Sequence, residues 1–121
     1  MQVPDVGTSA SCEVAEYVVR IVKAGAFEGE RPWDALDIAE IDGVTVRLHW
    51  TDQPYIWHVN DGPEVFVVLD GTFDMQVRED GVEHVHHLTP GSIFHAEPGD
   101  THRATPIGAA RALVIERAGS V

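Results

Sequence analysis

The stretch that decides the fold runs from Trp57 to Gly71 and reads Trp-His-Val-Asn-Asp-Gly-Pro-Glu-Val-Phe-Val-Val-Leu-Asp-Gly. His58 and Asn60 lie two positions apart, so on a β-strand both side chains point to the same face. The tight Asp-Gly-Pro turn separates this short strand from an apolar run that opens with Glu64. A hairpin of this kind predicts that Glu64 lies across the strand pair from His58 and Asn60.

Short segments with period-two alternation surround this stretch. One face of residues 44–51 carries Val44, Val46, Leu48 and Trp50, and the other carries Thr45, Arg47, His49 and Thr51. Turn pairs recur at short intervals, at residues 42–43, 61–63, 70–71, 80–81, 90–91 and 98–99. Several short strands at this spacing, with no helical pattern between them, predict an all-β sandwich or barrel.

The first third of the chain is ambiguous. Residues 1–10 mix Pro, Gly, Ser and Thr, and we expect them to trail loosely. Residues 11–24 fit a helix capped by Ser11 and stopped by Gly25, but β-branched side chains favour an extra or exchanged strand at residues 17–23. The expected organisation is a leader over residues 1–34, a barrel over residues 35–117 and a short tail over residues 118–121.

The stretch from His58 to Gly71 resembles the first motif of the cupin family. That motif runs as Gly, five residues, His-x-His, three or four residues, Glu, six residues and Gly. Here His58, Glu64 and Gly71 match the spacing, Asn60 replaces the second histidine, and residues 51–54 lack the leading glycine.

The second cupin motif has its counterpart near the C-terminus. It runs as Gly, five residues, Pro-x-Gly, two residues, His, three residues and Asn, and Gly91, Gly99 and His102 fall in register with it. The sequence departs from the pattern at Glu97, where proline is usual, and at Pro106, where asparagine is usual.

The resemblance implies a double-stranded β-helix, or jelly-roll barrel, often dimeric and with a metal inside. Carried over position by position, the ligands are His58, Glu64 and His102, with Asn60 at the place of the second histidine. Imidazole and carboxylate donors suit Fe, Mn, Ni or Zn as a divalent ion. We therefore expect a metal-dependent enzyme acting on a small polar metabolite, whether as isomerase, epimerase, lyase or dioxygenase. The alternative is a binding barrel without turnover, in which the same side chains form a hydrogen-bonded polar network without metal.

Further side chains are candidates for the pocket. If the polar face of residues 44–51 looks inward, Arg47 would bind an anionic group and His49 would assist proton transfer; we favour the outward orientation, in which both are surface residues. Phe66 and Val68 share the parity of Glu64 and are expected to floor the pocket. His95, which precedes the second motif's turn, is a further candidate.

Other conspicuous residues receive plainer interpretations. His84, His86 and His87 are assigned to a hairpin surface or an interface. Trp33, Trp50 and Tyr55 fit pocket walls, although core or interface packing is the more common role of aromatic side chains. Cys12 is interpreted as an inert thiol, and a single cysteine, which cannot form an internal disulfide, fits a cytoplasmic protein.

Charge and composition exclude some partners. The formal net charge of −12 opposes binding to nucleic acid or to anionic lipid. The sequence has no apolar run of about 20 residues, the length that a membrane-spanning helix needs. The valine-rich residues 17–22, together with Val65 and Leu69, are expected to contribute to a homodimer interface.

Overall fold

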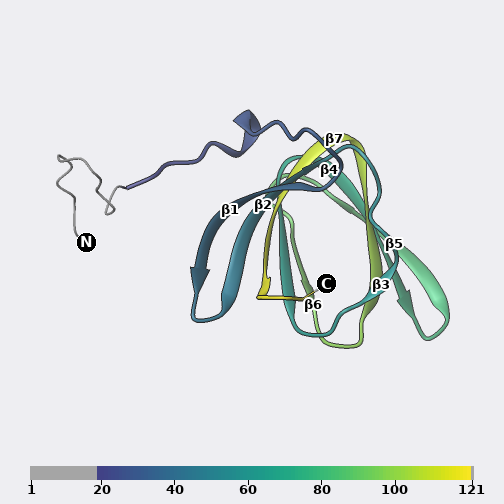
Figure 1. Cartoon of the computed structure of the whole chain (residues 1–121). Coiled ribbons are helices and arrows are strands. Elements are labelled where there is room, and N and C mark those ends of the chain that lie inside the picture. The colour runs from purple at the N-terminus through teal and green to yellow at the C-terminus, as the bar shows by residue number, and fades with distance from the viewer. Residues whose placement is uncertain (1–18, 121) are drawn as a thin grey trace, which may run out of the picture.

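Two long antiparallel strands form the centre of the molecule. In the computed structural model, which describes residues 19–120, β4 (Glu64–Glu79) pairs with β7 (Thr101–Arg117) along most of its length (Figure 1). The sheet order is β1-β2-β7-β4-β5, with β3 pairing β7 and β6 pairing β4. The flanking strands are β1 (Asp34–Ile41), β2 (Val44–Thr51), β3 (His58–Val59), β5 (Val82–Leu88) and β6 (Ile93–Ala96). The described residues include only one short helical turn, η1 (Ala24–Ala26), so the predicted all-β jelly-roll barrel is confirmed.

The predicted turns fall into two groups. At Asp42-Gly43 and Asp80-Gly81 both residues have positive φ, as type I′ turns between paired strands require. The turn expected at Asp70-Gly71 is wrong, because these residues lie inside β4 at a register shift in its pairing with β7. Gly71 has φ +72, and a Cβ there would lie 2.7 Å from the Ala109 carbonyl oxygen, so this irregularity needs glycine.

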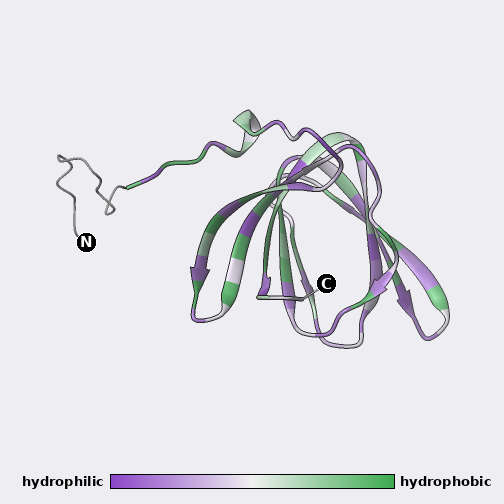
Figure 2. Ribbon diagram, in the orientation of Figure 1, coloured by the Kyte–Doolittle hydropathy of each residue, from purple (hydrophilic) through white to green (hydrophobic). Residues whose placement is uncertain are grey.

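The apolar core follows from strand alternation. Phe66, Phe73 and Met75 on β4 are buried together with small residues of β7, and the neighbouring side chains point outward. Figure 2 shows the corresponding alternation of apolar and polar residues along the strands. Burying each large apolar side chain contributes about 1.5–3 kcal/mol to stability. Leu48 and Trp50, predicted to share one face of β2, are both buried.

The segment before β1 is attached to the barrel by two arginines. Buried Arg111 donates through Nε to the Phe27 carbonyl at 2.7 Å and pairs with Asp70 at 2.6 Å. Arg20 donates to the carbonyl oxygens of Asp37 and Ile38 on β1. The segment therefore contacts β1 through Arg20 and β7 through Phe27, and it passes over the top of the barrel in the view of Figure 1.

Some predictions for residues 1–34 concern residues that the structure does not describe. These are the trailing residues 1–10, Cys12, and the start of the strand expected at 17–23. Within that segment, residues 19–23 are not assigned to a strand with any other described residue. A strand exchanged with a second copy stays a prediction. Among residues 19–120 no helix is long and apolar enough to cross a membrane.

Candidate metal centre

Three different strands bring the predicted ligands together. His58 on β3 lies opposite His102 on β7 in the strand register. On its other side β7 pairs with β4, which begins at Glu64. The predicted hairpin between His58 and Glu64 is therefore wrong, because β3 and β4 do not pair with each other. Across β7 from His58, the β4 residue opposite His102 is Val77, whereas Glu64 lies at the other end of β4 and pairs with Glu116. The two side chains meet across the inside of the barrel, because the long strands β4 and β7 curve and bring their opposite ends to face each other.

The ligand atoms of His58, Glu64 and His102 all lie within 4.8 Å of one another. The His58 and His102 rings meet at 4.4 Å between centroids, and His102 Nε2 lies 3.3 Å from Glu64 Oε1. Glu64 and His102 are buried, with 9% and 2% of their surface exposed. The cluster is the one group of three or more potential ligands found among residues 19–120.

The buried donor atoms fit a divalent cation. Glu64 Oε1 has no hydrogen-bond partner among the described residues, since its contact with His102 lacks hydrogen-bond geometry. Leaving a buried carboxylate oxygen unpaired is costly, and a metal ion at this point would remove that cost. Two imidazoles and one carboxylate also form a set that leaves coordination positions open for water or substrate.

Asn60, the fourth predicted ligand, is also buried. Its backbone N–H donates to the Asp100 carbonyl at 3.0 Å, and its carbonyl accepts from Gly99 N–H at 2.9 Å. Its side-chain Nδ2 is buried with no hydrogen-bond partner among the described residues. The backbone is thus fixed by the turn that leads into β7, whereas a metal-binding role for the side chain stays a prediction.

A cavity of about 200 Å³ opens beside the three ligands. Its walls include Trp33, Tyr55 and Phe66, and its polar lining includes Arg47, His49 and Glu116. The expectation of an outward orientation is therefore wrong for His49, which is half-buried, whereas Arg47 lines the cavity with 45% of its side chain exposed and pairs with exposed Asp37. The barrel curves so that this face of β2 looks into the cavity, while Leu48 and Trp50 are covered on the other side.

Two other predicted pocket residues lie elsewhere. Val68 is fully buried in the apolar core, and it is not part of the cavity lining. His95 is exposed on β6, with Nε2 3.1 Å from Glu97 Oε2. Strand parity placed Phe66 and Val68 on the same side of β4, but the cavity extends only as far as Phe66.

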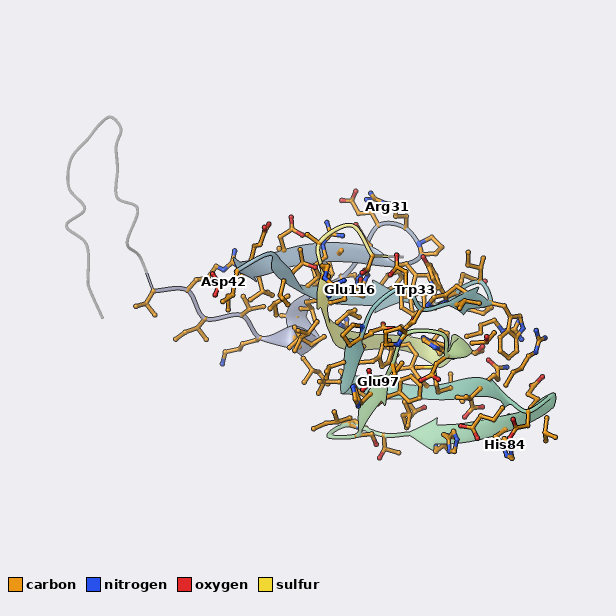
Figure 3. The ribbon with its side chains drawn as sticks, turned by 90° about the horizontal axis from the view of Figure 1, so that it is seen from below. Arg31, Trp33, Asp42, His84, Glu97 and Glu116 are labelled. Carbon is orange, nitrogen blue, oxygen red and sulfur yellow. The ribbon has the colours of Figure 1, made fainter. Side chains whose placement is uncertain are left out.

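Trp33 enters the cavity from the loop before β1 (Figure 3). Its φ of +58 is rare for a bulky side chain, and such a conformation costs on the order of 1–3 kcal/mol. The indole packs edge-on against Tyr55 at 5.2 Å and His49 at 5.9 Å between ring centroids. This packing stabilises Trp33 in its strained conformation, and Trp33 and Tyr55 together form an aromatic wall of the cavity.

Burial shifts the protonation of two groups in the cavity. Burial lowers the pKa of His49. Its Nδ1 lies 3.3 Å from the Trp33 carbonyl oxygen, a contact that opposes this shift. A neutral imidazole must donate from Nδ1 to that carbonyl, so Nε2 retains a free lone pair.

Glu116 was not anticipated by sequence reasoning. Burial, reinforced by the negative charges of Glu64 and Asp61, raises its pKa to about 7, while Arg47 acts in the opposite direction. It is the register neighbour of Glu64 across β4 and β7. The available signal was alternation along β7, which places Glu116 on the same face as Val114.

The remaining histidines lie outside the cavity. His84, His86 and His87 are exposed on β5, which agrees with their assignment to a hairpin surface. His87 Nδ1 is 2.8 Å from Asp74 Oδ1 on β4.

Two of the tryptophans lie outside the cavity lining. Trp50 is buried. Trp57, opposite in parity to His58, stacks under the Arg78 guanidinium, which lies 3.9 Å from the ring centroid.

Comparison with known proteins gives matches in structure alone. No protein-family model and no curated protein matches the sequence. Among solved structures, the chain is similar to a cupin-2 domain containing protein from Shewanella frigidimarina, with 23% identity and a TM-score of 0.66. That match covers 74% of this chain and 84% of the other.

Two more distant matches come from larger proteins. One is hydroxypropylphosphonic acid epoxidase from S. wedmorenis, solved with fosfomycin: identity is 16%, the TM-score is 0.54, and 61% of this chain and 43% of that chain are covered. The other is the vicilin of Solanum melongena, described with anionic ligands in its pockets: identity is 18%, the TM-score is 0.56, and coverage is 65% and 22%. The strand order, the ligand cluster and these similarities agree, and the chain has the cupin fold.

Proposed function

We propose that this chain is a metal-dependent enzyme that acts on a small polar metabolite. The observation that carries the proposal is the buried cluster of His58, Glu64 and His102 beside a cavity with polar and aromatic walls. Bound there, a divalent Fe, Mn, Ni or Zn ion would polarise a substrate oxygen or activate water or O₂. Asn60 is proposed to complete the ligand set, either directly or through a water molecule.

The cavity supplies a base that does not bind the metal. His49 Nε2 is free to accept a proton, because the contact of Nδ1 with the Trp33 carbonyl fixes the tautomer and burial favours the neutral ring. Removing a proton from a bound substrate is thus the step assigned to His49. Glu116, whose pKa is raised to about 7, can donate or accept a hydrogen bond near neutral pH.

Size and charge restrict the substrate. A cavity of about 200 Å³ fits a small molecule, smaller than the ligands of typical drug-sized pockets. Arg47 is the cationic group of the lining, and its Nε is held by Asp37 Oδ1 at 2.7 Å. One cation suits a single anionic group, such as a carboxylate, more than a multiply charged phosphate. Isomerase, epimerase, lyase and dioxygenase reactions all remain compatible with these residues.

The second candidate function is binding without turnover. Asn60 in place of a histidine favours it, because a neutral amide is a weaker ligand than an imidazole. The fold itself does not decide, since an epoxidase and a vicilin both contain it. The choice between an enzyme and a binding protein therefore depends on the residues of the site.

Elemental analysis of protein purified without a histidine tag tests the proposal. We expect stoichiometric metal in the wild type, loss of that metal in His102→Ala, and retention in the matched control His95→Ala, because His95 is an exposed histidine outside the cluster. Metal-dependent conversion of a small carboxylic acid, slowed in His49→Gln with metal content unchanged, would support the enzyme. Absence of metal from the wild type, or ligand binding without turnover, would favour the second candidate.

A homodimer is part of the same proposal. Val19 and Ile21 are 61% and 82% exposed in the extended segment, and Leu69 on the barrel is 41% exposed. A second copy that accepts this segment would cover apolar surface that a single copy leaves in water. Light scattering tests it: a monomer at all concentrations would contradict the dimer.

A further inference from the structure

Strand β5 is an unprotected edge of the sheet. It lies at the end of the strand order, and within residues 19–120 it pairs only with β4. Its first six residues are exposed, and only Leu88 is half-buried. The outer row of backbone N–H and C=O groups of β5 therefore faces solvent, an arrangement that normally invites pairing with another chain.

The opposite edge is protected in ways that β5 is not. On β1, Arg20 covers the carbonyl oxygens of Asp37 and Ile38, and a register shift follows Asp37. Strand β5 has no proline, lysine or register shift, and Glu83 is its only acidic or basic residue besides the histidines. In a chain of net charge −12, this strand is a nearly neutral place at which a second copy can approach.

The turn fixes which residues of β5 face the free edge. Asp80-Gly81 is a two-residue turn, so Glu79 and Val82 form the hydrogen-bonded pair that closes the hairpin. Hydrogen-bonded and non-hydrogen-bonded pairs then alternate along the strands. The backbone groups of Val82, His84 and His86 point to β4, and those of Glu83, Val85 and His87 point outward.

The sequence of β5 is self-complementary about Val85. Antiparallel pairing with a second β5, on a two-fold axis through Val85, joins Val85 to itself by two backbone hydrogen bonds. The flanking pairs are Glu83 with His87, His84 with His86, and Val82 with Leu88. Each pair matches in character: acid with imidazole, imidazole with imidazole, and apolar with apolar. Shifting the register by one residue would place these side chains on opposite faces.

We propose that two copies pair through β5 and that His84 and His86 of both copies bind one divalent metal ion on the two-fold axis. His84 and His86 lie in register with Val77 and Met75, so they share one face of the hairpin. In the dimer they form non-hydrogen-bonded pairs, in which opposite Cα atoms are only about 4.5 Å apart. Val85 points to the other face, which leaves the space between the four imidazoles open. Four nitrogens at about 2.0–2.1 Å suit tetrahedral zinc.

The second copy is needed to complete this site. Within one copy, His84 and His86 belong to no group of three potential ligands among the described residues. Two imidazoles alone bind a metal weakly, whereas four from a symmetric pair fill its coordination shell. The hairpin of β4 and β5 projects on the side away from the N-terminal segment (Figure 1). His84 lies apart from Trp33 and Glu116 (Figure 3), so the proposed interface does not include these two residues of the cavity lining.

Zinc chloride alone, added to metal-free protein, tests the inference by sedimentation velocity and bound-metal analysis. We expect zinc to double the mass of the species present in EDTA, with one zinc per two chains bound beyond the zinc of the barrel. His84→Ala and His86→Ala should each abolish the doubling, and His95→Ala should retain it. Val85→Lys should also abolish it, because two like charges would face each other on the axis.

Each opposite result would overturn the inference. A mass that zinc does not change, doubling that persists in the His84→Ala/His86→Ala double variant, or doubling that persists in Val85→Lys would each exclude the paired β5 site. These side chains are exposed, so the variants should keep the wild-type circular dichroism spectrum and melting temperature. Barrel metal counted in the double variant reports the proposed function separately.

Discussion

His102 Nε2 lies 3.3 Å from Glu64 Oε1, and both side chains are almost completely shielded from water. The two residues come from β7 and β4, and the His58 ring closes the group from β3. The carboxylate oxygen has no hydrogen-bond partner among the described residues, so the pair fits the proposed binding of a divalent cation.

Glu64→Gln should remove the metal without unfolding the protein. The amide keeps the shape of the side chain but lacks the negative charge that a divalent ion needs, so metal affinity should fall by more than about tenfold, the lower end of what even an outer-shell change costs. The metal-free variant should be at least as stable as metal-free wild type, because a buried unpaired charge is gone. Metal titration and urea unfolding in EDTA measure the two effects. Unchanged metal affinity would exclude Glu64 as a ligand.

Asn60→His should raise metal affinity by about tenfold or more, since an imidazole is a stronger ligand than an amide oxygen. The comparison requires competition with a chelator, applied to wild type and variant under the same conditions. Asn60 is buried, with 5% of its surface exposed, so the melting temperature in EDTA must be compared as well. An affinity equal to that of wild type in a folded variant would place residue 60 outside the ligand set.

Stability of the metal-free protein should fall as pH rises through about 7. The pKa of Glu116 is raised to about 7 from an ordinary value of 4.5, so the folded state holds this proton more tightly than the unfolded state does. Its contribution is complete below about pH 4.5 and is lost as pH rises through the folded pKa. Solvent screening of this half-buried group limits the effect to on the order of 1–2 kcal/mol.

Urea unfolding of Glu116→Gln in EDTA checks this assignment. The difference in free energy of unfolding between wild type and variant should change between about pH 5 and about pH 8 by the amount above. Arg47→Met is a useful companion, since Arg47 lowers the pKa of Glu116, and its loss should move the transition to higher pH. A pH-independent difference would mean that Glu116 titrates normally.

Gly71→Ala should destabilise the barrel more than Gly43→Ala. Both glycines have positive φ, +72 and +80, so both substitutions introduce backbone strain of about 1–2 kcal/mol. Only at Gly71 would the new Cβ meet backbone, 2.7 Å from the Ala109 carbonyl oxygen, whereas the space around Gly43 is open. The total loss at Gly71 should reach about 2–4 kcal/mol in the free energy of unfolding. Equal losses would show that the β4 irregularity tolerates a side chain.

The architecture could be predicted from the sequence because it depends on local patterns, and the three residues of the candidate metal cluster could be predicted because their spacing resembles the cupin motifs. Alternation of apolar residues marks strands, and Asp-Gly pairs mark two-residue turns such as the one at Asp80-Gly81. His58, Glu64 and His102 lie together as predicted, even though the predicted hairpin between His58 and Glu64 does not exist. The prediction of the cluster was correct because of the resemblance to the cupin motifs, and the assumed pairing of the strands of His58 and Glu64 did not contribute to it.

The predictions of side-chain orientation were wrong where orientation depends on the curvature of the sheet or on residues distant in the sequence. Strand parity assigned Arg47 and His49 to one face of β2, but only closure of the barrel determined that this face lines the cavity. Parity likewise grouped Val68 with Phe66, yet the depth of the cavity separates them.

The sequence by itself determined the strands and most of the turns, since each depends on residues close together along the chain, and the motif spacing identified the three residues of the candidate metal cluster. Tertiary structure alone decided that His58 and Glu64 meet across the inside of the barrel, which polar face looks inward, and that Glu116 lies beside Glu64. These properties depend on long-range pairing and on exclusion of water, and no local pattern encodes either.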